Sequence, residues 1–116
     1  MALDLTDTTT GYLLGRLFYV LERTEERAIK GVRLSIRDRY YSIASTTPSA
    51  IYPHLMKLNN YHTAMIERDG WTVTVHTLID QIVSGLQDFP AHLNLEDQGR
   101  FAVGYYHQRE ALNESN

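Results

Sequence analysis

Residues 11–21 read GYLLGRLFYVL. Apolar side chains recur in this stretch at the i, i+3 and i+4 spacing that marks the core-facing side of a helix. These side chains are Leu13, Leu14, Leu17, Phe18 and Leu21. Thr8–Thr10 offer N-caps and Gly31 offers a C-cap, so we predict a helix from about Thr10 to Lys30. The charged residues within 22–27 are expected to form its solvent-exposed end.

A second and a third helix are predicted from the residues that start them. Ser35–Asp38 has the spacing of a capping box, which favours a short helix over about Ser35–Ala44. Thr47-Pro48 favours the start of a third helix, and Asp69-Gly70 would end it. Pro53 would either kink this third helix or delay its start. Its expected buried face consists of Ile51, Leu55, Leu58, Tyr61, His62, Met65 and Ile66.

Residues 71–76, Trp-Thr-Val-Thr-Val-His, alternate in polarity like a strand. A single strand of this length would have no partner in a chain that otherwise reads as helical. Apolar residues then continue at helical spacing at Leu78, Ile79, Ile82, Val83 and Leu86. We therefore predict a fourth helix from about Thr72 to Leu86.

The last helix is predicted to follow a loop at Phe89–His92. Asn94 is its expected N-cap, and the helix should extend over about Leu95–Leu112. Gly99 and Gly104 would allow another helix to approach closely. The side chains expected to face inward are Phe101, Ala102, Tyr105 and Leu112.

The predicted fold is all-α, a compact bundle of about five helices that forms a single domain over residues 1–116. The polar segments 1–8 and 113–116 are expected to be flexible tails. No apolar run approaches the roughly 20 residues that span a bilayer, and the N-terminus lacks the features of a signal peptide. We therefore expect a cytoplasmic protein with no membrane partner.

Residues that could support catalysis form no recognisable pattern. The chain has no cysteine, which excludes disulfides, thiolate catalysis and cysteine-ligated zinc. Its five histidines form no HExxH motif, its serines lie in no nucleophile elbow, and its glycines form no phosphate loop. We predict a protein that is not an enzyme and that uses no metal, cofactor or small-molecule substrate.

Charge is distributed unevenly along the chain. The net charge is −3, but residues 1–60 carry +2 and residues 61–116 carry −5. Within residues 27–57 the only acidic residue is Asp38, and the local charge is +5 from six cations: Arg27, Lys30, Arg33, Arg37, Arg39 and Lys57. Three of these cations, Arg33, Arg37 and Arg39, lie close to Tyr40 and Tyr41 in the sequence. Such a mixture suits phosphate contact and base stacking. The alternative is a solvated surface whose cations pair with Glu25, Glu26 and Asp38, and composition does not decide between the two.

Three strings of residues have the order and spacing of a known protein family. They are Gly11–Phe18 with Val20–Glu22, Ile36–Tyr41 with Ala44–Pro48, and Phe89–Leu93 with Gln98–Arg109. Together they resemble the C-terminal helical domain of the large subunit of the type I-C CRISPR effector, Cascade. The resemblance covers roughly Thr10 to Leu112.

In that family the same stretch is also made as a separate polypeptide, by translation from an internal start, and serves as the small subunit. A chain that begins at Met1, a few residues before the first string, is similar to that product. The resemblance implies a non-catalytic bundle, present in more than one copy, that braces the complex in antiviral defence. Its implied partners are the backbone and large subunits, further copies of itself, the guide RNA, and the target and displaced DNA strands.

Six cations are predicted to contact nucleic acid: Lys30, Arg33, Arg37, Arg39, Lys57 and Arg16. Five arginines lie inside the strings that carry the resemblance, which does not assign nucleic-acid contacts among them: Arg16, Arg37, Arg39, Arg100 and Arg109. Arg16 follows a glycine on an apolar helix, so a structural ion pair is the alternative for this residue.

Two other functions remain open from the sequence. A protein–protein adaptor would depend on apolar or tyrosine surface residues such as Tyr106. An independent DNA-binding regulator could use the second and third helices as a helix-turn-helix, although the acidic net charge counts against it.

Overall fold

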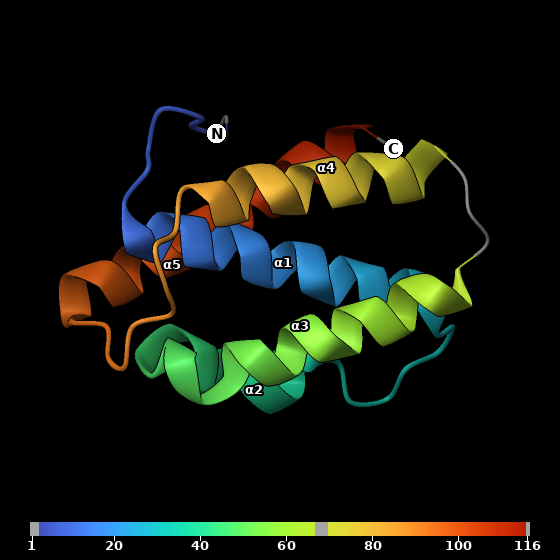
Figure 1. The fold of residues 1–116 in the computed structure, drawn as a ribbon, viewed down its shortest axis with the longest axis horizontal. Helices are drawn as coiled ribbons and strands as arrows, with labels where there is room; N and C mark the ends of the chain where they lie inside the picture. Colours follow the sequence, from blue (N-terminus) through green and yellow to red (C-terminus); the bar gives the residue numbers. More distant parts are fainter. Residues whose placement is uncertain (1–2, 67–69, 116) are drawn as a thin grey trace.

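The computed structural model describes residues 3–66 and 70–115. These residues form five helices and no strand: α1 (Thr10–Ala28), α2 (Ile36–Thr46), α3 (Pro48–Met65), α4 (Gly70–Ser84) and α5 (Leu95–Ser115). The prediction of an all-α fold with five helices is confirmed. Helix α1 runs through the middle of the molecule, with α4 on one side of it and α2 and α3 on the other (Figure 1).

Helix α1 is the central element of the core. Every residue from Gly11 to Glu22 is buried, because each of the other four helices packs against α1. A helix that is surrounded in this way buries more than one face. The predicted stripe at Leu13–Leu21 is therefore correct but incomplete, since Tyr12, Tyr19 and Val20 are buried as well.

Helices α1 and α5 touch through their backbones. A Cβ atom at Gly11 would overlap the carbonyl of Asp97, and one at Gly15 would overlap the carbonyl of Phe101. On the α5 side, a Cβ at Gly104 would overlap the carbonyl of Tyr12. Glycine at these positions therefore allows the two helices to approach more closely than any side chain would permit. The expectation for Gly104 is confirmed.

The expectation for Gly99 is wrong, because nothing lies within 4 Å of the position that its Cβ would take. Gly99 is exposed to solvent.

Aromatic rings fill the space between α1, α2 and α5. The Phe18 ring lies 5.6 Å from Tyr41 and 5.8 Å from Phe101, and Tyr41 lies 5.5 Å from Tyr105. These edge-to-face and tilted contacts add to the burial of large apolar surfaces. They fix the short helix α2, which has few buried residues of its own, against the α1–α5 pair.

Helix α3 packs against α1 through residues that the sequence pattern identified only in part. Ile51, Leu55 and His62 are buried as predicted, but Tyr61 and Met65 are 63% and 49% exposed. The reason is that α1 lies between α3 and α4 (Figure 1), so α4 does not cover this part of α3. Tyr52, which the pattern missed, is fully buried and donates a hydrogen bond to the carbonyl of Leu14 at 2.5 Å.

The predicted caps are largely confirmed. The Ser35 hydroxyl accepts from the Asp38 amide and the Asp38 carboxylate accepts from the Ser35 amide, both at 3.1 Å. Asn94 caps α5 through a 2.8 Å bond from the Asp97 amide. Pro48 is the first residue of α3, whose start is not delayed by Pro53.

Several predicted helix ends are wrong. Helix α1 ends at Ala28, and Gly31 adopts its positive φ of 70° three residues later, inside the connection to α2. Helix α3 ends at Met65, and Gly70 begins α4 instead of ending α3. Asp69, the other residue of that predicted stop, lies outside the described residues. Residues 71–76 are helical, as predicted.

Helix α5 extends to Ser115, past the predicted end at Leu112. None of the helices in residues 3–66 and 70–115 has the length and apolarity that a bilayer span requires.

The backbone contact between α1 and α5 gives a direct test of the fold. Gly15→Ala should destabilise the protein by about 2 kcal/mol or more, because the added methyl group meets backbone that cannot move aside. Urea unfolding of the purified chain measures this change. Gly99→Ala is the matched control, and it should be neutral or stabilise by up to about 1 kcal/mol because the site is open and helical. Equal effects of the two substitutions would contradict the predicted close contact.

Candidate nucleic-acid interface

Glu25 on α1 holds the start of α2 in place. Its carboxylate is buried and accepts a 2.8 Å hydrogen bond from the backbone amide of Ile36, in the first turn of α2. The other carboxylate oxygen accepts from the Arg39 guanidinium at 3.0 Å. A carboxylate at a helix N-terminus is favourable because it meets unpaired amides and the positive end of the helix dipole. The prediction that this end of α1 is solvent-exposed is therefore wrong for Glu25.

Arg39 begins a row of cationic and aromatic side chains across α2 and α3. Its guanidinium lies 5.0 Å from the centre of the Tyr40 ring. The Tyr40 ring meets His54 of α3 edge-on at 5.7 Å, and Lys57 follows His54 after about one helical turn. We call Arg39, Tyr40, His54 and Lys57 the basic strip. The structure thus brings together two predicted cations, Arg39 and Lys57, that lie far apart in the sequence.

Two more predicted cations lie in the connection between α1 and α2. Lys30 and Arg33 are both exposed, and neither forms a hydrogen bond or an ion pair with another described residue. Lys57 is likewise exposed and without such a partner in the described ranges. The charges of these three residues are therefore available to an external anion.

Arg37 lies on the opposite edge of α2, facing α5. Its guanidinium donates to the Tyr106 hydroxyl at 2.8 Å and lies 5.3 Å from the centre of the Tyr105 ring. It also lies 5.9 Å from the Tyr41 ring. These contacts hold the cation over aromatic faces without neutralising its charge.

A pocket of about 420 Å³ opens beside Arg37, between α1, α2 and α5. Three arginines line this space, Arg23, Arg37 and Arg109, and we call it the arginine pocket. The carboxylates on its walls are Glu22, Glu26 and Asp38.

Glu22 forms the inner wall of the arginine pocket. It is almost fully buried, and its carboxylate accepts a hydrogen bond from the Tyr105 hydroxyl at 2.6 Å. Burial raises the pKa of Glu22 from 4.5 to about 7, because a charged carboxylate loses solvation there, and the neighbouring Glu26 adds repulsion. Burial also raises the pKa of Tyr105. The predicted solvent exposure of Glu22 is wrong, because α5 covers this side of α1.

Arg16 lies apart from the other predicted cations. It is buried, and its Nε donates to the Gln108 side chain of α5 at 2.9 Å. Burial lowers the pKa of Arg16. It faces a separate hollow beside the N-terminal segment and α4. This arrangement agrees with the structural alternative, although the partner is an amide and not a carboxylate.

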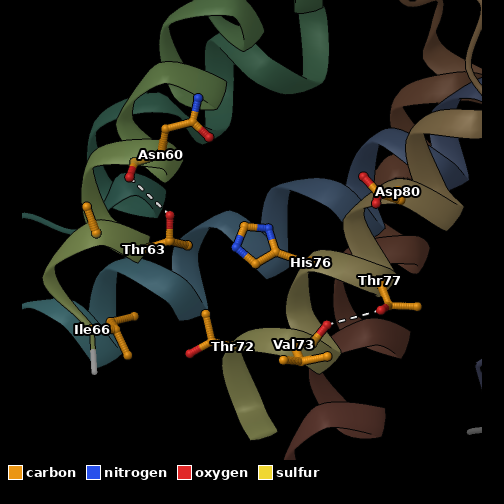
Figure 2. Close-up of a pocket in the computed structure, with 9 residues that line it drawn as sticks. Asn60, Thr63, Ile66, Thr72, Val73, His76, Thr77 and Asp80 are labelled. Atoms are coloured by element: carbon orange, nitrogen blue, oxygen red, sulfur yellow. Dashed lines mark hydrogen bonds between the residues drawn. The ribbon is translucent and has the colours of Figure 1, made fainter. Parts of the chain in front are cut away.

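A larger hollow of about 660 Å³ separates α3 from α4 (Figure 2). Asn60 and Thr63 approach it from α3, and His76 projects into it from α4, with Asp80 one turn further on. No lysine or arginine is among the described residues that line it, so it does not suit a phosphate backbone.

Residues of the arginine pocket were partly missed by sequence reasoning. Arg23 and Arg109 were not among the predicted contacts, although Arg109 lies in the third string that carries the family resemblance. Its position four residues after Tyr105 places it on the same face of α5, but nothing in the sequence pairs it with Arg23 and Arg37. Among the described residues, no group of three His, Cys, Asp or Glu side chains could hold a metal ion.

Comparison with known proteins agrees with the resemblance. A family model described as CRISPR-associated protein (Cas_Csd1) matches residues 1–113. No curated protein matches the chain. The matched residues include the whole basic strip and all three arginines of the arginine pocket.

The raised pKa of Glu22 predicts a specific pH dependence of stability. The folded chain keeps a proton on Glu22 that the unfolded chain releases, so this group lowers the free energy of unfolding as the pH rises from about 4.5 to about 7. The slope should reach at most about 1.4 kcal/mol per pH unit. Urea unfolding of the wild type and of Glu22→Gln at several pH values isolates the effect, because the other groups titrate in both. Parallel curves for the two proteins would contradict it.

Proposed function

Because the chain belongs to the Csd1 family of CRISPR-associated proteins, the family of the type I-C large subunit, we propose that it is a small subunit of type I-C Cascade. In this proposal it catalyses no reaction. It braces the backbone of the complex and helps bind the guide RNA–target DNA hybrid and the displaced DNA strand. Its partners are the backbone and large subunits and further copies of itself.

The packing of the chain supports a separate subunit. One hydrophobic core contains buried residues from all five helices described, so the family domain closes on itself. The radius of gyration is 13.3 Å, which is close to the value of about 13 Å expected for a folded domain of this length.

The observation that carries the nucleic-acid role is the arrangement of exposed cations around the start of α2. Lys30 and Arg33 lie in the connection that leads into α2, and the basic strip follows on α2 and α3. Glu25 anchors the first turn of α2 and Arg39 to α1. Cations that alternate with aromatic rings suit backbone phosphates and stacked bases without reading a sequence. This fits an RNA-guided complex, in which base pairing supplies sequence specificity.

The exposed cations give the test of this proposal. Changing Lys30, Arg33 and Lys57 together to Gln should weaken DNA binding by the assembled complex and lower its salt slope by about one unit for each lost phosphate contact. Binding isotherms over a series of salt concentrations measure both. These residues have no partner among the described residues, so the fold should not suffer. Arg39 is left unchanged because removing it would unpair the buried Glu25.

Arg100→Gln is the control for loss of an arginine elsewhere, since Arg100 pairs with Glu96 and Asp97 in the first turns of α5. An unchanged DNA affinity for the triple variant at every salt concentration would refute the nucleic-acid role of this surface.

A protein–protein adaptor is the second candidate, and the hollow between α3 and α4 favours it. The hollow is flanked by the exposed Val73 and lined by small polar side chains that would let another chain approach closely (Figure 2). Tyr106 no longer separates the two candidates, because it binds Arg37 and belongs to the cationic side of the molecule.

Val73→Asp tests the adaptor role. If the hollow holds a partner protein, this change should reduce the amount of chain that co-purifies with the complex. Val103→Asp is the matched control, since Val103 is similarly exposed on α5. Equal recovery of the two variants would remove the support for this candidate.

A further inference from the structure

The arginine pocket gathers three guanidinium groups from three different helices. Arg23 comes from α1, Arg37 from α2 and Arg109 from α5. Such convergence requires the folded molecule, because these residues are distant in the sequence. Guanidinium groups bind tetrahedral oxyanions well, since their N–H donors form a planar fork that matches two oxygens at once.

The donors of these arginines are largely unused within the protein. The Nε of Arg23 is buried and has no hydrogen-bond partner, and its Nη1 lies at a long 3.4 Å from Glu26. Within residues 3–66 and 70–115, Arg37 donates a hydrogen bond to the neutral Tyr106 hydroxyl alone, and Arg109 forms no ion pair. Buried donors without acceptors are rare in folded proteins and call for an explanation. A bound anion that accepts a hydrogen bond from the Arg23 Nε would explain this buried donor.

The carboxylates around the pocket do not cancel its positive charge under all conditions. The Asp38 carboxylate accepts a hydrogen bond from the Ser35 amide at 3.1 Å. Glu26 is the acceptor of the long contact with Arg23. Glu22 is held by the Tyr105 hydroxyl. With Glu22 protonated, the lining has three cations against two anions; with Glu22 ionised, the charges balance.

We propose that the arginine pocket binds one phosphodiester group, held by Arg23, Arg37 and Arg109. This inference rests on the proposed function. It adds a second site, outside the basic strip, at which a nucleic-acid strand binds. The aromatic ring of Tyr106 borders the same side of Arg37 and gives a neighbouring base a surface for stacking. A free oxyanion shares the chemistry of the strand phosphate, and the experiments below distinguish the two sources.

Binding at this site should depend on pH through Glu22. The groups that face Glu22 are Tyr19, Arg23 and Glu26 of α1, Arg37 and Asp38 of α2, and Tyr105 and Arg109 of α5. Burial raises the pKa of both tyrosines, so they keep their protons at neutral pH. Protonation of Glu22 therefore removes one negative charge beside the bound anion. Affinity should rise by up to about tenfold from pH 8 to pH 6 if the anion binds only when Glu22 is protonated.

The first experiment titrates the full chain with dimethyl phosphate, a diester whose single charge does not change in this pH range. Two-dimensional NMR follows the arginine Nε–H signals at pH 6, 7 and 8. We expect saturable shifts at Arg23, Arg37 and Arg109, with tighter binding at pH 6. Arg109→Gln should abolish the shifts, Glu22→Gln should remove the pH dependence, and Arg100→Gln should change neither.

Shifts that do not saturate, or that survive Arg109→Gln, would overturn the proposal. Arg109 is exposed, so this variant tests the site without disturbing the core.

The second experiment places Arg109→Gln in the assembled complex and measures DNA affinity against salt. A fall in affinity, with a salt slope lower by about one unit, identifies the strand as the source of the phosphate. If Arg109→Gln abolishes dimethyl phosphate binding and leaves DNA binding unchanged, the pocket takes a free anion and the assignment to a strand fails. The variant with Lys30, Arg33 and Lys57 changed to Gln tests the proposed function separately, because these three cations lie outside this pocket.

Discussion

The close backbone contact between α1 and α5 is the constraint on which the other features of the molecule depend. Gly11, Gly15 and Gly104 let the two helices meet with no side chain between them. The pair then forms one aromatic surface around Phe18 and Tyr105, on which α2 packs. The arginine pocket lies where α2 meets this pair, and the basic strip extends from α2 onto α3. Both therefore depend on the position of α2, which the contact between α1 and α5 determines.

Buried carboxylates connect this packing to function. Glu25 orders the first turn of α2 and holds Arg39 at its surface, while Glu22 lies beneath the arginine pocket and responds to pH near neutrality. Both carboxylates lie on α1, one turn apart, but they serve different neighbours. Removing a partner from a buried carboxylate is costly, and these two residues therefore couple the stability of the bundle to the presentation of its cations.

The sequence predicted the elements better than it predicted the surfaces. Helical spacing and capping residues such as Ser35 and Asn94 identified five helices, because those signals are local. The same reasoning placed Glu22 and Glu25 in solvent, since a charged helix end looks exposed until another helix covers it. It placed Tyr61 and Met65 in the core, because periodicity does not reveal that α4 leaves this part of α3 uncovered. The arginine pocket could not be predicted as a site, because its three arginines meet only through long-range packing.

We propose that this bundle joins type I-C Cascade and increases the affinity of the complex for target DNA. The most direct test is to assemble the remaining subunits and the guide RNA with and without the chain, and then to compare co-elution and target-DNA affinity. We expect the chain to co-elute with the complex and its presence to lower the dissociation constant for target DNA. A chain that elutes alone and leaves that constant unchanged would show that it is not such a subunit.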